Sequence, residues 1–249
     1  MSGHSKWATI KRKKGATDAK RGQLFSKLSR AIIIAAKEGG ADPESNATLA
    51  TAIQKARDNS MPKDNIERAI QRGAGSGEGD NYESMLYEGY AAGGVAVICT
   101  ILTDNRNRTA SDLRFIFTKN GGSLGTPGSV AWQFDRKGVI VVEAEGVDED
   151  ALMEVALSGG AEDIAEDGDH WQITTEPHDF MPVRNALEEA KIGYTSADLT
   201  MVPKTTVEPT ENEARQILRM IDQLEDNDDV QDVYANFDIS EEILEAVAG

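Results

Sequence analysis

The chain of 249 residues is 39% hydrophobic and 28% charged, the composition of a soluble protein with room for one to three compact domains. No apolar run approaches the roughly 18 residues needed to cross a bilayer, and no apolar stretch follows the basic amino terminus as it would in a secretory signal. We therefore expect a soluble, cytoplasmic protein with no membrane partner.

The net charge of −17 is unevenly distributed along the chain. Residues 1–37 hold seven Lys and three Arg against the single acid Asp18, so this segment carries +9 and the remainder carries −26. Residues 208–249 alone carry −11, from thirteen acids and two arginines. A chain with this net charge is not expected to bind polyanions indiscriminately. Its one basic segment, however, predicts a single directed contact with a polyanion.

The first part of the chain is predicted to be helical. Residues 1–22 are polar, basic and weakly periodic, which indicates an adaptable arm, and apolar residues then recur at helical spacing over 24–37. Asp42 and Pro43 have the pattern of an N-cap followed by a first helical residue, and a third helix is expected over 62–73. Three short amphipathic helices predict a small bundle.

Strand-type periodicity follows a glycine-rich linker at 73–79. We expect a hairpin of two strands at 85–92 and 95–103, joined by Gly93-Gly94, and then a helix over 109–120 with Thr109 as its N-cap. A loop at 121–128 and a strand at Val130–Asp135 complete this part. The single cysteine, Cys99, lies in the second strand, where it is expected to be a buried core residue. One cysteine allows no internal disulfide, which fits a reducing compartment.

From Gly138 onward the predicted order is β-α-β-β-α-β, the ferredoxin-like arrangement. The expected elements are strand 139–145, helix 149–157, a hairpin of 163–166 with 171–175, helix 180–191 and strand 194–202. The tail then supplies a helix at 212–225, a strand at 230–237 and a short helix at 241–247.

A helix and strand of this size cannot stand alone, so the tail is expected to complete the sheet begun at 85–135. This predicts an α+β multidomain protein: an amino-terminal helical bundle and two α/β domains. The expected units are 1–79 (arm and bundle), a discontinuous α/β domain formed by 80–137 with 203–249, and an inserted ferredoxin-like domain at 138–202.

No set of residues with catalytic spacing emerges from the chain. His170 and His178 flank a predicted strand, but they lack the convergent ligands of a transition-metal site. The acidic run 226–229 lacks the glycine and distal glutamate of a calcium loop and is interpreted as a solvated turn. We therefore expect no enzyme, no metal and no cofactor.

Two further segments have the composition of anion-binding loops. The glycine-rich 121–128 matches no phosphate-loop pattern and is interpreted as a helix-to-strand connection, although amides in such loops can cradle phosphate. Arg106 and Arg108 stand at the start of a predicted helix, within Asp104–Thr109. This segment fits either simple helix capping or an anion site.

The amino-terminal arm is the strongest local signal for function. Its lysines and arginines would neutralise phosphates without sequence preference, and Trp7 offers a face on which a base could stack. The alternatives are a solubilising tail and an arm docked on the protein's own acidic surface. With the two arginines above, the predicted nucleic-acid-binding residues are Lys6, Trp7, Lys11, Arg12, Lys13, Lys14, Lys20, Arg21, Arg106 and Arg108.

These motifs together resemble the YebC family over essentially the whole chain. The resemblance rests on GHSKW at 3–7 with IKRKK at 10–14, ARDNSMPKDNI at 56–66, YEGY at 87–90, TDNRNRT at 103–109, GGSL at 121–124 and GSVAWQF at 128–134.

The resemblance implies a three-domain protein, with a helical amino-terminal domain and two α/β domains. Bacterial relatives are described as probable transcriptional regulators that bind promoter DNA, and others are linked to ribosomes that translate proline-rich sequences. Mitochondrial relatives are translational activators of cytochrome c oxidase. Because the motifs begin with no presequence before them, we expect a bacterial cytoplasm.

We therefore expect a DNA-binding transcriptional regulator, with a ribosome- or RNA-binding translation factor as the alternative. The helices predicted at 42–57 and 62–72 are too poor in basic residues for an obvious reading helix. A basic arm with one tryptophan suits structured RNA at least as well as duplex DNA. An enzyme that would use the two arginines on a phosphorylated substrate lacks a base or nucleophile.

Overall fold

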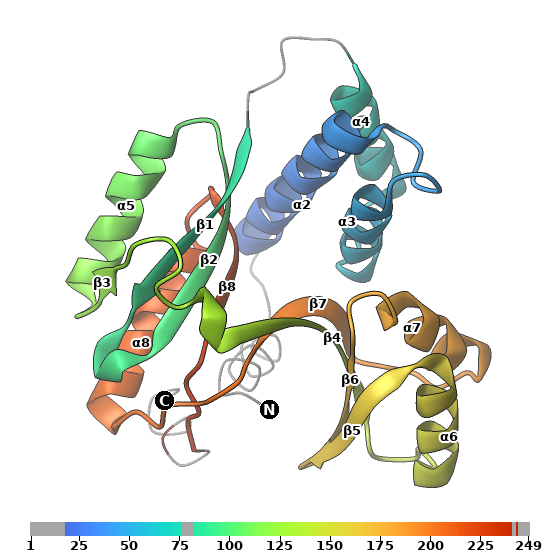
Figure 1. Ribbon diagram of the computed structural model, residues 1–249. Coiled ribbons are helices and arrows are strands. Elements are labelled where there is room, and N and C mark those ends of the chain that lie inside the picture. Colours follow the sequence, from blue (N-terminus) through green and yellow to red (C-terminus); the bar gives the residue numbers. More distant parts are fainter. Residues whose placement is uncertain (1–17, 76–81, 241–242, 244–249) are drawn as a thin grey trace.

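The computed structural model describes residues 18–75, 82–240 and 243, and its parts are a helical unit and two four-stranded sheets with their helices (Figure 1). The expected fold class, α+β with a helical amino-terminal region followed by two α/β domains, is confirmed. Within the described ranges, every helix is too short or too polar to span a bilayer.

The helical unit consists of α2 (Asp18–Gly39), α3 (Ala47–Asp58) and α4 (Lys63–Ala74). Its core is formed by side chains such as Ile32, Leu49 and Ala56, which are fully buried. At Gly73 the backbones of α4 and α2 touch, because a Cβ there would lie 2.4 Å from the carbonyl oxygen of Ile33.

Two expected helix starts in this unit are wrong. α2 begins at Asp18, so Lys20 and Arg21 belong to the helix instead of the arm. α3 begins at Ala47 because Asn46 is its N-cap: the Asn46 side chain accepts from the Leu49 N–H (3.0 Å) and donates to the Ala35 carbonyl (2.8 Å). The Asp42-Pro43 pair instead opens a turn, in which the Ser45 N–H donates to the Asp42 carbonyl.

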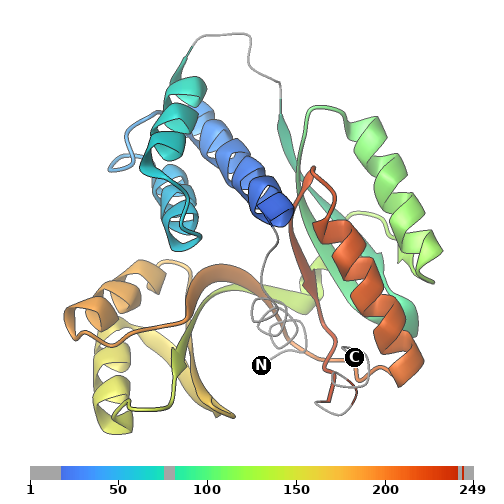
Figure 2. The same cartoon turned by 180° about the vertical axis from the view of Figure 1, so that it is seen from behind.

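The first sheet has the order β3-β1-β2-β8, in which all pairings are antiparallel. Its strands are β1 (Glu83–Tyr90), β2 (Ala96–Thr103), β3 (Ser123–Leu124) and β8 (Val230–Ala235). The helices α5 (Arg106–Lys119) and α8 (Glu211–Glu225) cover one face of it, as Figure 2 shows from behind, and bury Leu113, Phe117, Ile217 and Ile221. The tail strand β8 therefore pairs with β2, although the whole second sheet lies between them in sequence.

Two details of this sheet differ from expectation. The turn between β1 and β2 is a five-residue loop that contains the short 3-10 helix η1 (Ala92–Gly94), in which Gly93 and Gly94 have positive φ and the Ala91 N–H donates to the Val95 carbonyl. α5 starts three residues earlier than predicted, because Asn105 is its N-cap and accepts from the Arg108 N–H.

The second sheet has the order β5-β6-β4-β7, which is the ferredoxin-like order. Its strands are β4 (Phe134–Glu143), β5 (Ala161–Asp167), β6 (His170–Thr175) and β7 (Ser196–Pro203), and α6 (Glu149–Gly159) and α7 (Phe180–Glu189) pack on one face. The predicted β-α-β-β-α-β series is thus observed.

The strand expected at 139–145 is observed as the second half of β4. The separate strand expected at 130–135 is wrong, because β4 is one strand that starts at Phe134 after the 3-10 helix η2 (Ala131–Gln133). It pairs with β7 from Phe134↔Pro203 to Val141↔Ser196. Gly138 does not interrupt it: a Cβ there would lie 2.3 Å from Thr175 Oγ1, so the glycine allows a close approach inside the sheet.

The proposed boundary at 137/138 falls within β4, so we now infer that the inserted unit begins near Phe134. Four buried residues fill the junction between the two sheets: Ala96, Ile98, Val130 and Phe134. Of the short helix expected at 241–247, only Ile243 lies among the described residues, and it is helical.

Candidate nucleic-acid interface

The predicted contact residues fall into three groups in the chain. Those of the arm lie outside the described residues: Lys6, Trp7, Lys11, Arg12, Lys13 and Lys14. Lys20 and Arg21 lie at the start of α2, and Arg106 and Arg108 lie in the first turn of α5.

Lys20 and Arg21 are exposed cations at the end of α2 to which the arm is joined. Lys20 Nζ is 3.8 Å from the Asp226 carboxylate, and its side chain remains about half exposed. The Arg21 guanidinium lies over the Phe25 ring, 5.7 Å from its centroid. Neither contact removes the cation from solvent, so both side chains remain available to an anionic partner.

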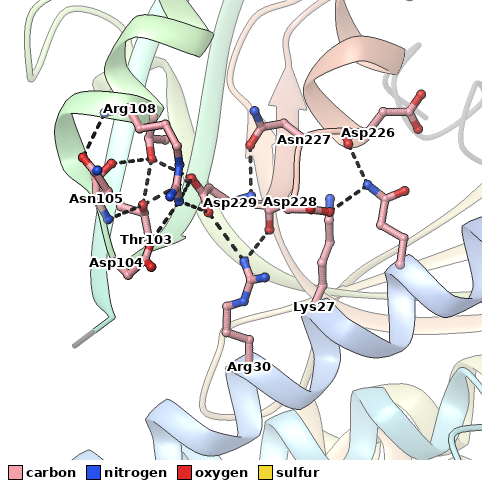
Figure 3. A network of polar contacts seen from close by, with 12 residues as sticks. Lys27, Arg30, Thr103, Asp104, Asn105, Arg108, Asp226, Asn227, Asp228 and Asp229 are labelled. Carbon is pink, nitrogen blue, oxygen red and sulfur yellow. Dashed lines mark hydrogen bonds and ion pairs between the residues drawn. The ribbon is translucent and has the colours of Figure 1, made fainter. Parts of the chain in front are cut away.

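Further along α2, three polar side chains contact the acidic turn between α8 and β8 (Figure 3). Gln23 Nε2 donates to the Asp226 carbonyl (2.6 Å), Lys27 Nζ to the Glu225 carbonyl (2.5 Å) and Arg30 Nη1 to the Asp228 carbonyl (2.6 Å). Because these carbonyls lie at and just beyond the carboxyl end of α8, the cations lie at the negative end of its dipole.

The contact between α2 and the turn at 225–229, called the joint below, buries charge as well as forming hydrogen bonds. Burial lowers the pKa of the Lys27 amine, although the carboxylates around it favour its charged form. Beside it, Lys55 Nζ of α3 is 2.6 Å from the Asp232 carboxylate. Burial alone would raise the pKa of Asp232, but Lys55, Thr100 and Lys27 together outweigh it and the pKa is lowered.

Asp229 is the centre of the joint and is only 6% exposed. Its carboxylate accepts two hydrogen bonds from Arg108 Nη2 (2.9 and 3.1 Å), one from Thr109 Oγ1 (2.8 Å) and one from Thr103 Oγ1 (3.2 Å). Arg30 Nη1 approaches it to 3.7 Å. Burial raises the pKa of Asp229, but the bonds from Arg108 and Thr109 outweigh burial and hold the pKa below its usual value.

The segment at 104–109 therefore caps a helix and also binds an anion, and the anion is Asp229 of the same chain. Residues 226–229 form the expected turn, and Asp226 and Asp228 are exposed, but Asp229 is buried between α5 and α2 instead of being solvated. The opposite charges of the two ends of the chain predicted a contact of the basic segment with the acidic tail, as Arg30 makes with Asp229, but they did not predict the part of Arg108.

Arg106 remains exposed and is 3.5 Å from the Glu83 carboxylate. It lines an open hollow with Tyr87, Asn107 and two acidic residues, Glu83 and Asp104. The two carboxylates weaken the attraction of this hollow for phosphate, so Arg106 is best suited to a peripheral contact.

The glycine-rich segment at 121–128 and the residues after it also enclose an anion of the protein itself. The buried Glu88 carboxylate accepts from the N–H groups of Gly128 (2.6 Å), Val130 (2.8 Å) and Ala131 (2.8 Å). Burial raises the pKa of Glu88, but these three hydrogen bonds outweigh it and the pKa is lowered. Amides that could have cradled a phosphate thus hold a side chain, which sequence reasoning did not foresee.

A separate ion pair joins the helical unit to the inserted unit. Arg184 of α7 is 3% exposed and donates through both terminal nitrogens to the Asp58 carboxylate at the end of α3 (3.0 and 3.1 Å). Its Nε also contacts Glu188 (3.1 Å), and its guanidinium lies over the Tyr194 ring. Sequence analysis missed this pair, since 126 residues separate the two partners.

The described residues offer little for catalysis. Over 18–75 and 82–240, no cluster of three or more His, Cys, Asp or Glu side chains is arranged to hold a metal ion. Cys99 is fully buried in β2, and burial raises the pKa of its thiol to about 12, which disfavours the reactive thiolate.

Comparison with known proteins agrees with this architecture. The family model "TACO1/YebC protein N-terminal domain" matches residues 5–76, and "TACO1/YebC second and third domain" matches 82–237. A "Probable transcriptional regulatory protein" of Rubrobacter xylanophilus is 65% identical over the full length of both chains, and one of Natranaerobius thermophilus is 54% identical over 98% of this chain and 99% of its own. The crystal structure of a conserved hypothetical protein from Aquifex aeolicus superposes with a TM-score of 0.80 at 48% identity, covering 91% of this chain and 94% of that one. The chain belongs to the TACO1/YebC family.

Proposed function

We propose that the protein is a nucleic-acid-binding regulator, and not an enzyme, that contacts phosphates through its basic amino-terminal segment. The leading form of the proposal is a DNA-binding transcriptional regulator in the cytoplasm. The names of the relatives from Rubrobacter xylanophilus and Natranaerobius thermophilus support a regulatory role.

The observation that carries the proposal is the segregation of charge. Residues 1–37 carry +9 on a protein whose remaining residues carry −26. The inner face of α2 binds the protein's own acidic turn through Lys27 and Arg30. Lys20, which is half exposed beside Asp226, and Arg21, which is exposed, continue the basic arm into α2 and are available to a partner. We assign Arg108 to holding Asp229 and keep Arg106 as a peripheral phosphate contact.

The alternative is an RNA-binding factor that acts on the ribosome and relieves stalling on difficult, proline-rich sequences. It is favoured by the lack of a clear reading helix among the described residues. Lys55 of α3 is paired with Asp232, Lys63 of α4 is 3.5 Å from Glu67, and Arg68 bonds to its own helix at Asp64 and Asn65. Direct readout of duplex DNA needs side chains that reach base edges from an element in the major groove.

The deciding experiment is a competition between ribosomes and promoter-length duplex DNA for the full-length protein at physiological salt. Crosslinks are then mapped onto the chain. Preference for duplex, with crosslinks at residues 6–21, is the result expected for the leading proposal. Preference for ribosomes would replace it with the alternative, and binding to neither would refute both.

A further inference from the structure

Trp132 stands out among the large apolar side chains of the described residues, because 68% of it is exposed. It lies in η2, between Val130, which is fully buried, and Phe134, which is 5% exposed. The chain thus anchors an apolar residue on each side of the tryptophan and turns the indole outward. Because most of its surface stays in water, the indole adds little hydrophobic stabilisation to the fold.

The ring is held by a hydrogen bond from its indole N–H, and hydrogen bonds also fix the backbone on each side of it. The indole N–H donates to the Ser129 carbonyl (3.1 Å), which also accepts from the Tyr90 hydroxyl (3.1 Å). The preceding backbone is fixed by the Glu88 carboxylate, which accepts from three N–H groups between 128 and 131.

The following residue is fixed equally well. The Gln133 N–H donates to the Val130 carbonyl (2.9 Å), the Lys204 N–H donates to the Gln133 carbonyl (2.8 Å), and Asn236 Nδ2 donates to Gln133 Oε1 (3.3 Å). A side chain that is already ordered loses little conformational entropy when it binds a partner. The segment around Trp132 is therefore built to present one rigid aromatic ring.

The surroundings of the ring favour one flat group as its partner. The other exposed large apolar side chains belong to different elements: Leu24, Leu86, Phe115, Leu157 and Met181. Protein partners usually bind where several apolar residues form a patch, whereas one ring suits one planar group. Beside it lies Lys204, the residue after β7, whose N–H donates to the Gln133 carbonyl (2.8 Å). Its half-exposed ammonium group is paired with Asp135 at 3.1 Å and can also contact a neighbouring phosphate.

We propose that Trp132 is a stacking platform for an unpaired nucleobase, with Lys204 beside it for the adjoining phosphate. The proposal rests on the proposed nucleic-acid function and adds that the nucleic acid is single-stranded where it meets this surface. Base faces are hidden inside a duplex, while single strands and RNA loops offer them to aromatic side chains. Glu88 is a positioning residue, since it holds the segment that carries the ring.

The test measures the affinity of the full-length protein for two fluorescent probes: a short single-stranded RNA of mixed sequence and a duplex DNA of equal length. Trp132→Ala is expected to weaken binding of the single strand on the order of ten-fold and to leave the duplex unchanged. Trp132→Phe should lose less. The matched control is Phe115→Ala, which removes a 65% exposed aromatic residue from α5 and should change neither affinity.

Two measurements make the test specific to contact. RNA that contains 5-iodouridine should photo-crosslink to Trp132 in the unmodified protein. Glu88→Gln should weaken single-strand binding although Trp132 is still present, with thermal unfolding used to check that the variant is folded. An unchanged affinity of Trp132→Ala for the single strand, or an equal loss on both probes, would overturn the inference. If the unmodified protein binds neither probe, the proposed function itself has failed; if it binds both and only Trp132→Ala is without effect, this inference alone has failed.

Discussion

Arg108 and Asp229 are joined by two hydrogen bonds, from Nη2 of the guanidinium to both carboxylate oxygens at 2.9 and 3.1 Å. Arg108 lies in the first turn of α5, and Asp229 lies just before β8. Arg30 of α2 approaches the same carboxylate. One buried acid thus connects the helical unit, the first helix of the α/β unit and the tail strand that completes its sheet.

Asp229→Asn is expected to lower the free energy of unfolding by about 1–3 kcal/mol. The neutral amide accepts weaker hydrogen bonds from Arg108 and cannot satisfy both buried threonine hydroxyls as the carboxylate does. Urea denaturation followed by circular dichroism measures the change. Asp112→Asn, which alters an exposed carboxylate on α5, is the control and should change stability by less than about 0.5 kcal/mol. Equal effects of the two substitutions would show that Asp229 is not a structural centre.

Stability should fall in acid, and the direction follows from the pKa values of Asp229 and Glu88. Both are lowered in the folded protein, so each carboxylate stabilises the fold above its unfolded pKa of about 4. That contribution is lost as the pH falls from about 5 through the lower folded values. Urea denaturation across this range should show the decline, and Asp229→Asn should flatten it. A variant as acid-sensitive as the unmodified protein would contradict this assignment.

Arg184→Met is expected to loosen the contact between α3 and α7 and to cost about 2–4 kcal/mol, because Asp58 loses its bidentate partner. Small-angle scattering should show a larger radius of gyration, and proteases should cut the helical unit away more readily. Arg114→Met, on the exposed face of α5, provides the control. If both variants remain as compact as the unmodified protein, the ion pair does not hold the units together.

Replacing either of two helical glycines of the helical unit by alanine should have opposite effects on stability. Gly73→Ala places a methyl group 2.4 Å from the Ile33 carbonyl oxygen, so α2 and α4 must separate and the melting temperature should fall. Gly22→Ala meets nothing within 4 Å and should stabilise α2 by about 0.5–1 kcal/mol. Thermal unfolding measures both. A stabilising Gly73→Ala would show that the two helices are not in backbone contact.

The sequence predicted the elements that repeat a regular pattern. Apolar periodicity located the three helices, the buried strand around Cys99 and the β-α-β-β-α-β order. It failed where a single residue decides a boundary. Asn46 and Asn105 cap their helices in place of Asp42 and Thr109. Gly138 lies inside a strand, at a place where Thr175 and Phe180 leave no room for a Cβ.

The joints between the units could not be predicted from the sequence. Each joins charged groups more than 100 residues apart, as Arg184 does with Asp58 and Lys55 with Asp232. Many acids of this chain could have filled those places, and only the packing of the helices selects among them. The charge pattern predicted that the basic and acidic ends attract each other. The structure shows part of this attraction in the contacts of α2 with the acidic turn at 225–229.

The proposed function requires that the basic arm binds nucleic acid, and charge reversal in the arm tests this requirement. Lys11, Arg12, Lys13 and Lys14 are replaced by Glu, and affinity for nucleic acid is measured at several salt concentrations. The control reverses four exposed cations elsewhere, Lys63, Arg114, Lys119 and Lys191, so that both variants have the same net charge. We expect the arm variant to lose binding and its salt dependence, because each lost phosphate contact removes nearly one unit from the slope of log affinity against log salt. Binding that survives in the arm variant with an unchanged slope, or that falls equally in the control, would contradict the claim.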